Sequence, residues 1–373
     1  MADPLGLYVH FPWCRHLCPY CDFPVAIARG EPPHDAYAAA IARELDERAP
    51  DVADRRLVSI YFGGGTPSLW RPDCLAGVIA HATSRFGARV DDLEVTIEAN
   101  PADCTPPRME AWRAAGIDRV SIGVQSLEPR ELVALGRDHR MGDGAAAITA
   151  ARGAGFRSIS ADLILGIPQL HDGALPPHVA AVARQVDHLS IYELTIEDRT
   201  LFGKRAREGT LVPLDDDTLA ALYEATHHAL GREGFEHYEV SSYARPGHRA
   251  VHNSLYWTGA DYLGVGVGAA SLRRTPDGGG VRTTNVRGAQ AYLDAQGDAR
   301  VAETLVEPAA ELAQDLRWLG LRTTRGIAAT SAPADFAAWL LEEGLAELDS
   351  DRLRPTLRGF LYADRVAARA ASS

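Results

Sequence analysis

Six short runs of apolar and β-branched residues recur in the first two hundred positions of this 373-residue chain, separated by stretches of helical periodicity. The runs cover residues 5–11, 57–62, 93–99, 119–124, 158–165 and 188–194. The clearest helical stretches cover residues 35–49, 72–85, 107–115, 142–154 and 216–233. Parallel strands have such continuous apolar runs because both of their faces are buried, and helices usually connect them. The alternation therefore predicts repeated βα units and an α/β fold.

Polar residues or glycines follow almost every one of these predicted strands. The ends in question are His10 with Cys14, residues 63–66, Glu98 with Asn100, Gln125 with Ser126, and Asp162 with Gly166. In parallel α/β folds, binding sites form beyond the carboxyl ends of the strands. We expect these groups to converge on one face of the molecule.

The pattern changes after about residue 235, where Tyr, Ser and Gly become abundant and residues 276–280 predict a surface loop. From residue 308 onward the order is a helix (310–321), a second helix (334–343), a hairpin around 349–351 and a final helix (357–370), as in a winged-helix unit. We predict three parts: a barrel core over residues 1–232, an extension over 233–300 and an α+β domain over 301–373.

Composition excludes some functional classes. A net charge of −12 disfavours a nucleic-acid partner, because nucleic-acid affinity depends on neutralising phosphates with Lys and Arg. No apolar run is long enough to span a bilayer, and the first residues lack the pattern of a secretory signal. We expect a cytoplasmic protein without a membrane span.

Three of the five cysteines fall within eight residues, as Cys14, Cys18 and Cys21. Stable disulfides are rare in the cytosol, so metal chemistry is the preferred interpretation of the Cys-x3-Cys-x2-Cys spacing. Three thiolates can hold an iron-sulfur cluster while leaving one iron open for chemistry. A zinc knuckle, or a chance grouping, is the alternative. Cys74 and Cys104 stand alone, and we interpret both as small buried apolar residues.

Gly63-Gly64-Gly65-Thr66-Pro67 directly follows a predicted strand. Glycines there let the backbone approach a ligand closely, although a glycine run by itself is more often a tight turn.

Together, the cysteine triplet and this glycine segment resemble the radical S-adenosylmethionine (SAM) enzymes. Further motifs resemble their coproporphyrinogen oxidase-like branch. They are Tyr8-Val9-His10-Phe11-Pro12-Trp13-Cys14, Ile97-Glu98-Ala99-Asn100-Pro101, Ser121-Ile122-Gly123-Val124-Gln125-Ser126, Leu135-Gly136-Arg137-Asp138-His139 and Asp162-Leu163-Ile164-Leu165-Gly166-Ile167-Pro168.

The resemblance implies a partial (β/α)6 TIM-like barrel, a 4Fe-4S cluster on the three cysteines, and SAM bound beside it. Such a cluster passes one electron to the SAM sulfonium, which releases methionine and a 5'-deoxyadenosyl radical. Carried over by position, the SAM contacts are Tyr8, Tyr20, Gly64, Gly65, Thr66, Glu98, Gln125, Arg137 and Asp162. Any one of them alone could be an ordinary polar residue at a strand end.

Two features distinguish branches of the family. The oxygen-independent coproporphyrinogen III oxidases carry a further cysteine two residues after the third ligand, where this chain has Phe23. The segment Cys18-Pro19-Tyr20-Cys21-Asp22-Phe23 is similar instead to the HemW group of haem chaperones, as is His252-Asn253-Ser254-Leu255-Tyr256-Trp257. The HemW resemblance implies His252 as a haem ligand, whereas an unaligned loop histidine is usually a hydrogen-bonded structural residue.

The resemblance to HemW therefore predicts a haem chaperone that binds a 4Fe-4S cluster, SAM and haem, and delivers haem to acceptor proteins such as respiratory proteins. The alternative is an enzyme, either a coproporphyrinogen III oxidase or another radical SAM oxidoreductase acting on a porphyrin. An iron-sulfur protein with a purely structural or electron-transfer role is a third possibility. Peripheral membrane contact and a homodimer stay open, and His10, His139 and His237 are unranked candidates for lining the cavity.

Overall fold

A computed structural model describes residues 2–168 and 175–371. The six predicted strands are present and lie side by side in one parallel array, in the order of the chain. They are β1 (Pro4–Phe11), β4 (Arg56–Gly64), β5 (Glu94–Ala99), β6 (Arg119–Gln125), β7 (Ser158–Leu165) and β8 (His188–Glu193). The prediction of an α/β fold built on a partial barrel is confirmed.

The region after residue 235, where the sequence pattern changes, is more regular than the sequence indicated and continues the sheet. Strand β11 (Asp261–Gly266) pairs in parallel with β1, as a seventh parallel strand. Antiparallel strands then extend both ends of what becomes a twelve-stranded sheet. They are β12 (Ala270–Arg274), β13 (Gly280–Asn285) and β14 (Val301–Glu307) beyond β11, and β10 (Ser242–Ala244) and β9 (Glu236–Glu239) beyond β8. The three-part division of the chain stays a prediction.

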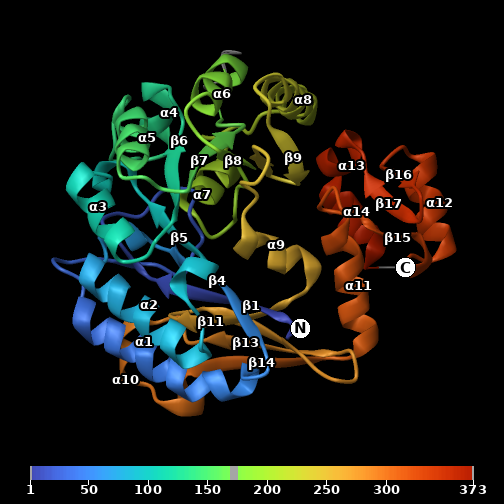
Figure 1. The fold of residues 1–373 in the computed structure, drawn as a ribbon. Helices are drawn as coiled ribbons and strands as arrows, with labels where there is room; N and C mark the ends of the chain where they lie inside the picture. Colours follow the sequence, from blue (N-terminus) through green and yellow to red (C-terminus); the bar gives the residue numbers. More distant parts are fainter. Residues whose placement is uncertain (1, 169–174, 372–373) are drawn as a thin grey trace.

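All five predicted helices form, and they cover the outer side of the curved sheet (Figure 1). They are α1 (His34–Arg48), α2 (Pro72–Phe86), α3 (Pro106–Ala114), α5 (Asp143–Gly153) and α8 (Asp216–Arg232). The sequence interpretation missed α4 (Pro129–Ala134), α6 (Leu175–Ala183), α7 (Leu201–Arg207), α9 (Val251–Thr258) and α10 (Ala289–Asp294). Most of these are too short for helical periodicity to be recognised.

Strand β1 shows how the two faces of the sheet differ. Leu5, Leu7, Val9 and Phe11 are fully buried in the main hydrophobic core. The residues between them, among them Tyr8 and His10, point to the opposite face because side chains alternate along a strand. The inner face of the barrel therefore carries the polar and aromatic side chains, and the helices are held by the apolar outer face.

The C-terminal unit is an α+β structure set to one side of the barrel (Figure 1). Its elements are α11 (Ala309–Gly320), β15 (Ile327–Ala328), α12 (Ala334–Glu342), β16 (Ala346–Asp349), β17 (Arg352–Pro355), α13 (Leu357–Leu361) and α14 (Ala363–Ala370). The prediction of one final helix is wrong, because the helical conformation is interrupted at Tyr362, between α13 and α14. Phe360 is buried against His237 of the barrel, while Val366 belongs to the core of the C-terminal unit.

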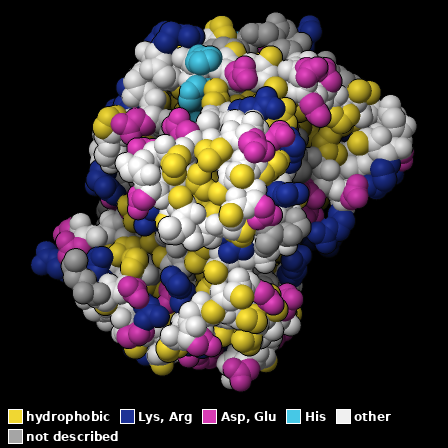
Figure 2. Space-filling model, turned by 90° about the vertical axis from the view of Figure 1, so that its right-hand side faces the viewer, with side chains coloured by type: hydrophobic (Ala, Val, Ile, Leu, Met, Phe, Trp, Pro, Cys, Tyr) yellow, Lys and Arg dark blue, Asp and Glu magenta, His cyan; other side chains and the backbone are white. Residues whose placement is uncertain are grey.

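Acidic and basic side chains are interspersed over the face of the molecule shown in Figure 2, without a basic stripe on that face. Across residues 2–168 and 175–371, no helix combines the length and apolar character needed to cross a membrane.

Candidate functional site

A cavity of about 590 Å³ lies at the carboxyl ends of the parallel strands. It is lined by all three cysteines of the triplet and by eight of the nine residues predicted to contact SAM. Those lining residues are Cys14, Cys18, Cys21, Tyr20, Gly64, Gly65, Thr66, Glu98, Gln125, Arg137 and Asp162. The fold thus brings together groups that are up to 148 positions apart in the sequence.

The cysteine loop leaves β2 (Trp13–Cys14) and returns through β3 (Ala26–Ile27), and the two short strands pair in parallel. The three thiols are free and partly exposed to the cavity. The Thr66 hydroxyl donates to Cys14 Sγ at 3.4 Å. Burial raises the pKa of the Cys14 thiol to about 11, and the Thr66 hydrogen bond opposes that rise. A thiol of this kind becomes a thiolate when a metal centre supplies positive charge.

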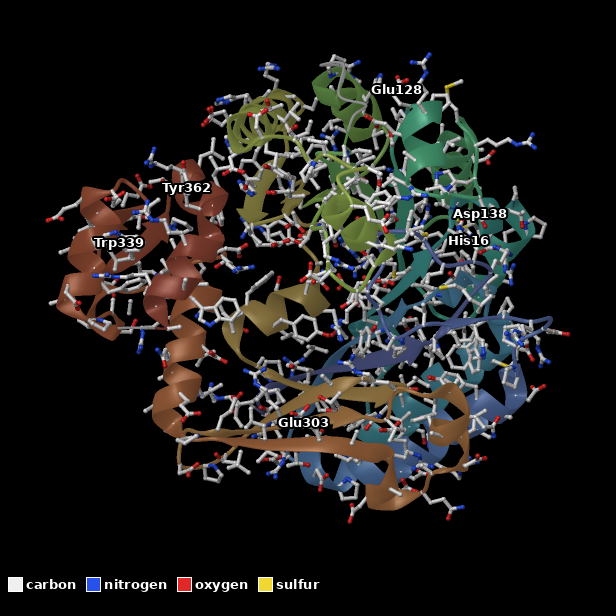
Figure 3. The ribbon with its side chains drawn as sticks, turned by 180° about the vertical axis from the view of Figure 1, so that it is seen from behind. His16, Glu128, Asp138, Glu303, Trp339 and Tyr362 are labelled. Atoms are coloured by element: carbon white, nitrogen blue, oxygen red, sulfur yellow. The ribbon has the colours of Figure 1, made fainter. Side chains whose placement is uncertain are left out.

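The loop is anchored across the cavity by His16. Its Nε2 lies 2.7 Å from the carbonyl oxygen of Gly136, and its Nδ1 lies 3.8 Å from Asp138 Oδ2 (Figure 3). Asp138 in turn accepts a hydrogen bond from Asn100 Nδ2 at 2.9 Å. These contacts hold the cysteine loop to the segments that follow β5 and α4.

The glycine segment at the end of β4 brings its backbone into the site. Gly64 has a φ of +109°, a conformation open to glycine alone, and its N–H donates to Glu98 Oε2 at 3.1 Å. A Cβ atom on Gly65 would lie 2.8 Å from the backbone of Pro12. Both positions therefore require glycine, so the motif is more than a surface turn.

Two carboxylates from neighbouring parts of the sheet line the cavity. Burial raises the pKa of Glu98 to about 7, although hydrogen bonds from Tyr61 and Gly64 oppose the rise. Burial also raises the pKa of Asp162 to about 6, against a hydrogen bond of 2.9 Å from Ser121. The charge of Asp162 adds to the raised pKa of Glu98, and perturbed carboxylates that share a cleft are typical of functional sites. A ligand carrying an ammonium or sulfonium group would relieve that cost.

Arg137 and Gln125 supply the best test of fit for an amino-acid ligand. Arg137 Nε is buried without a hydrogen-bond partner among the described residues, while the same guanidinium contacts Cys18 Sγ at 3.7 Å. A carboxylate at the cluster would satisfy that nitrogen. Gln125 has a φ of +65°, which is uncommon for a residue other than glycine and is often found at ligand sites. The residues present fit a 4Fe-4S cluster and SAM.

Tyr8 is the one predicted SAM contact that does not line the cavity. Its hydroxyl lies 3.0 Å from His10 Nδ1, one layer beneath the glycine segment.

None of the three unranked histidines lines the cavity either: His10 contacts the carbonyl of Pro24, His139 that of Val124, and His237 stacks on Tyr243. Asn100, which was named among the polar strand ends, also lines the cavity, whereas sequence reasoning missed Ser121 and Tyr192 as site residues. Their positions at strand ends or on the inner face of strands were the available signal.

His252 lies at the opposite end of the barrel from the cysteines, on α9. Its side chain is 1% exposed, and both ring nitrogens have partners: Ser59 Oγ lies 2.9 Å from Nδ1 and Tyr256 Oη 2.8 Å from Nε2. An imidazole must offer a free nitrogen to bind haem iron. In this conformation His252 cannot do so.

Comparisons with known proteins agree with this geometry. Residues 8–180 match the family model described as the radical SAM superfamily. The protein named heme chaperone HemW from Escherichia coli (strain K12) is 39% identical over 306 residues, which cover 80% of each chain. HemW from Mycobacterium tuberculosis (strain ATCC 25618 / H37Rv) is 37% identical and covers 98% of this chain and 94% of its own length.

Among solved structures, coproporphyrinogen III oxidase (HemN) from Escherichia coli, described as a radical SAM enzyme, matches with a TM-score of 0.82. The match covers 99% of this chain and 90% of that one, at 22% identity, and so establishes a shared fold. From the sequence matches, the chain belongs to the HemW family of the radical SAM superfamily.

Proposed function

We propose that this protein is a haem chaperone that binds a 4Fe-4S cluster, SAM and haem, and delivers haem to acceptor proteins, respiratory proteins among them. Membership of the radical SAM superfamily implies the cluster and SAM. Relatives that match most of the chain carry the name heme chaperone HemW. The observation that carries the proposal is a cavity whose floor is polar and whose mouth is apolar.

The floor of the cavity is suited to the cluster and SAM. Cys14, Cys18 and Cys21 would hold the cluster, and a reduced cluster of this kind can supply one electron to SAM. Arg137 would bind the SAM carboxylate, and the acidic pair Glu98 and Asp162 would hold its cationic and ribose groups. The other predicted contacts would fix the orientation of the bound ligand and keep water away from it.

The mouth of the cavity is suited to a flat apolar macrocycle. Phe23 is 65% exposed and Leu17 is 57% exposed, and both side chains line the cavity. Large apolar side chains that gather at one exposed place usually mark a binding surface. Aromatic rings can stack on a porphyrin, so this edge is our proposed place for haem.

The alternative is coproporphyrinogen III oxidase activity, or another radical reaction on a porphyrin. The likeness to HemN at 22% identity supports the fold alone. Phe23 occupies the place where the resemblance to the oxidases requires a further cysteine, which favours the chaperone. A cytoplasmic location is a further part of the proposal.

A haem titration tests the role of the cavity mouth. We expect the double variant Leu17→Ala/Phe23→Ala to bind haem roughly tenfold more weakly than the wild type, because two apolar contacts are lost. Leu348→Ala is a matched control, since Leu348 is 56% exposed on β16 of the C-terminal unit. Soret absorbance of cluster-reconstituted protein measures both affinities. Equal haem binding by the double variant and the wild type would contradict the proposed haem position.

Two further assays separate the chaperone from the enzyme. Haem-loaded protein should transfer haem to a haem-free acceptor such as apomyoglobin, which the Soret maximum reports. Incubation under anaerobic conditions with dithionite, SAM and coproporphyrinogen should leave the porphyrinogen unchanged. Its oxidative decarboxylation would replace the chaperone proposal with the oxidase.

A further inference from the structure

Helix α9 closes the end of the barrel opposite the cysteines. It packs against β1, β4 and β11 near their amino ends, and α11 runs past its outer side (Figure 1). Gly6 of β1 allows this close approach, because a Cβ atom there would lie 2.9 Å from Leu255 and 3.2 Å from the His252 ring. The His252 backbone N–H donates to Glu94 Oε1 at 3.0 Å. The first turn of α9 is therefore fixed to the amino ends of the barrel strands.

Between this end of the barrel and the SAM cavity, the rings of His252, Tyr61 and Tyr8 form a cluster, in which the Tyr8 and His252 centroids are also only 6.4 Å apart. The His252 ring stacks on Tyr61 with centroids 5.0 Å apart and planes inclined by 25°. Tyr61 also stacks on Tyr8, at 6.1 Å and 26°. Ser59, Tyr61 and Gly63 alternate along the inner face of β4, so one strand carries the contacts upward from His252.

Glu98 lies next to this cluster of rings, and its side chain lines the cavity. The Tyr61 hydroxyl donates to Glu98 Oε1 at 2.8 Å, and the Gly64 N–H donates to Oε2 at 3.1 Å. The Tyr61 hydroxyl thus orients one carboxylate oxygen, and the backbone at the end of β4 orients the other. The Tyr61 ring packs against both the His252 and the Tyr8 rings, so the direction of its hydroxyl depends on these two neighbours.

We propose that His252 is a positioning residue for SAM: its ring packs against Tyr61 and supports it, and the Tyr61 hydroxyl in turn orients the Glu98 carboxylate in the cavity. This inference rests on the proposed function, since it assumes that the cavity binds SAM. Without the imidazole, Ser59 and Tyr256 lose their hydrogen-bond partner and the Tyr61 ring loses its lower support. Glu98 then samples orientations that bind SAM less well, although it is about 150 residues away in the sequence.

The chain offers a closely matched control in His188 of β8. Its side chain is also 1% exposed, and its ring nitrogens also face a serine and a tyrosine, Ser160 Oγ at 2.8 Å and Tyr238 Oη at 2.8 Å. The His188 ring packs against Tyr238, with centroids 5.7 Å apart. Tyr238 is not among the residues that hydrogen-bond Glu98. His188→Ala should therefore cost similar stability without the same effect on SAM.

The experiment measures SAM and haem affinities of the cluster-reconstituted full-length protein by anaerobic calorimetry and Soret titration. We expect His252→Ala to weaken SAM binding roughly tenfold, and Tyr61→Phe, which keeps the ring but removes the hydroxyl, to do the same. His188→Ala should stay within about threefold of wild type. Because the two residues act through one path, the double variant should lose little more SAM affinity than either single variant. Haem affinity should change by less than about twofold in Tyr61→Phe and His252→Ala.

Three outcomes decide the matter. SAM affinities of His252→Ala and Tyr61→Phe equal to that of His188→Ala would overturn the inference while leaving the proposed function intact. Loss of haem binding with unchanged SAM binding in His252→Ala would instead make His252 a haem ligand. If the wild-type protein with an intact cluster binds no SAM, the proposed function itself fails and the inference falls with it. Should His252→Ala not fold, His252→Gln replaces it: the amide can keep a hydrogen bond to Ser59 or Tyr256 but removes the ring that supports Tyr61, and a SAM affinity equal to that of the wild type would overturn the inference.

Discussion

At the carboxyl ends of the strands, inner-face side chains surround an open cavity, whereas at the amino ends similar side chains are covered by α9. Strand β5 contributes one glutamate to each end. Glu94 lies 3.7 Å from the Arg119 guanidinium and accepts the His252 N–H, so it is satisfied by the protein. Glu98 faces Asp162 across the cavity. Its hydrogen bonds come from the Tyr61 hydroxyl and the Gly64 N–H, and among the described residues no Lys or Arg forms an ion pair with it. The comparison teaches that polar groups on one barrel face become a site only where the fold leaves them without full compensation.

The largest effect should come from the cysteine loop. Cys18→Ala should abolish the broad charge-transfer absorption of a reconstituted 4Fe-4S cluster, because two thiolates cannot hold it. Cys74→Ala is the control, since Cys74 is buried at 6% exposure on α2, away from the cavity. Iron content and the intensity of the charge-transfer absorption measure both variants. An unchanged spectrum in Cys18→Ala would contradict the assignment of a cluster to this cysteine loop.

A second test concerns backbone at the open end. Gly64→Ala should lower the free energy of unfolding by about 2 to 4 kcal/mol, because φ is +109° and the new Cβ would lie 2.5 Å from the His10 ring. Gly77→Ala should instead raise it by about 0.5 to 1 kcal/mol, since that position is an exposed helical site with free space. Chemical denaturation measures both. Equal stabilities would show that the glycine segment is an ordinary turn.

A third test sharpens the contrast between compensated and uncompensated groups. Arg137→Ala should weaken SAM binding roughly thirtyfold, because a charged hydrogen-bond partner for a carboxylate is lost. Arg137→Lys should give an intermediate loss, since an ammonium lacks the planar fork of a guanidinium. Calorimetry with SAM reports both values. If the SAM affinities of both variants stay within about threefold of the wild-type value, the unpaired Nε of Arg137 does not mark a ligand-binding position.

The smallest effect is a pH dependence of the ligand-free protein. The Glu98 pKa is raised from 4.5 to about 7, so between these values the folded state holds a proton that the unfolded chain has released. The free energy of unfolding therefore falls as pH rises through this window and levels off above it. Glu98→Gln should remove this component, which we expect to be about 1 to 3 kcal/mol. Melting temperatures between about pH 5 and pH 8 test it; parallel curves for variant and wild type would show that Glu98 titrates normally.

Much of the molecule was predictable because the signals are local. Each of the six early strands is a continuous apolar run, and each of the five predicted helices has a clear period. Strand β11 was missed because glycines lower strand propensity, and Gly264 is required for a reason that lies elsewhere: its Cβ would meet the Ala270 carbonyl oxygen at 2.0 Å. Helix α9 was missed because eight residues give little periodicity.

The predicted SAM contacts at strand ends line the cavity, whereas Tyr8, one layer lower in the barrel, does not. Tyr8 was expected to contact SAM but supports the layer beneath it. Its side chain lies on the inner face, as expected from strand alternation, but its depth in the barrel depends on the register of β1 against β4. Register is a property of paired strands, and one strand's sequence cannot supply it.

The sequence by itself determined the βα architecture, the three thiols in one short loop and the glycines that carry the backbone to them. These follow from local periodicity, spacing and conformational freedom, which do not depend on distant residues. Only the tertiary structure decided that Arg137 keeps an unpaired nitrogen beside Cys18, and that His252 is buried under Tyr61 instead of open to a ligand. Burial and hydrogen-bond satisfaction are set by which segments meet in space, and that information arises only when the barrel closes on α9.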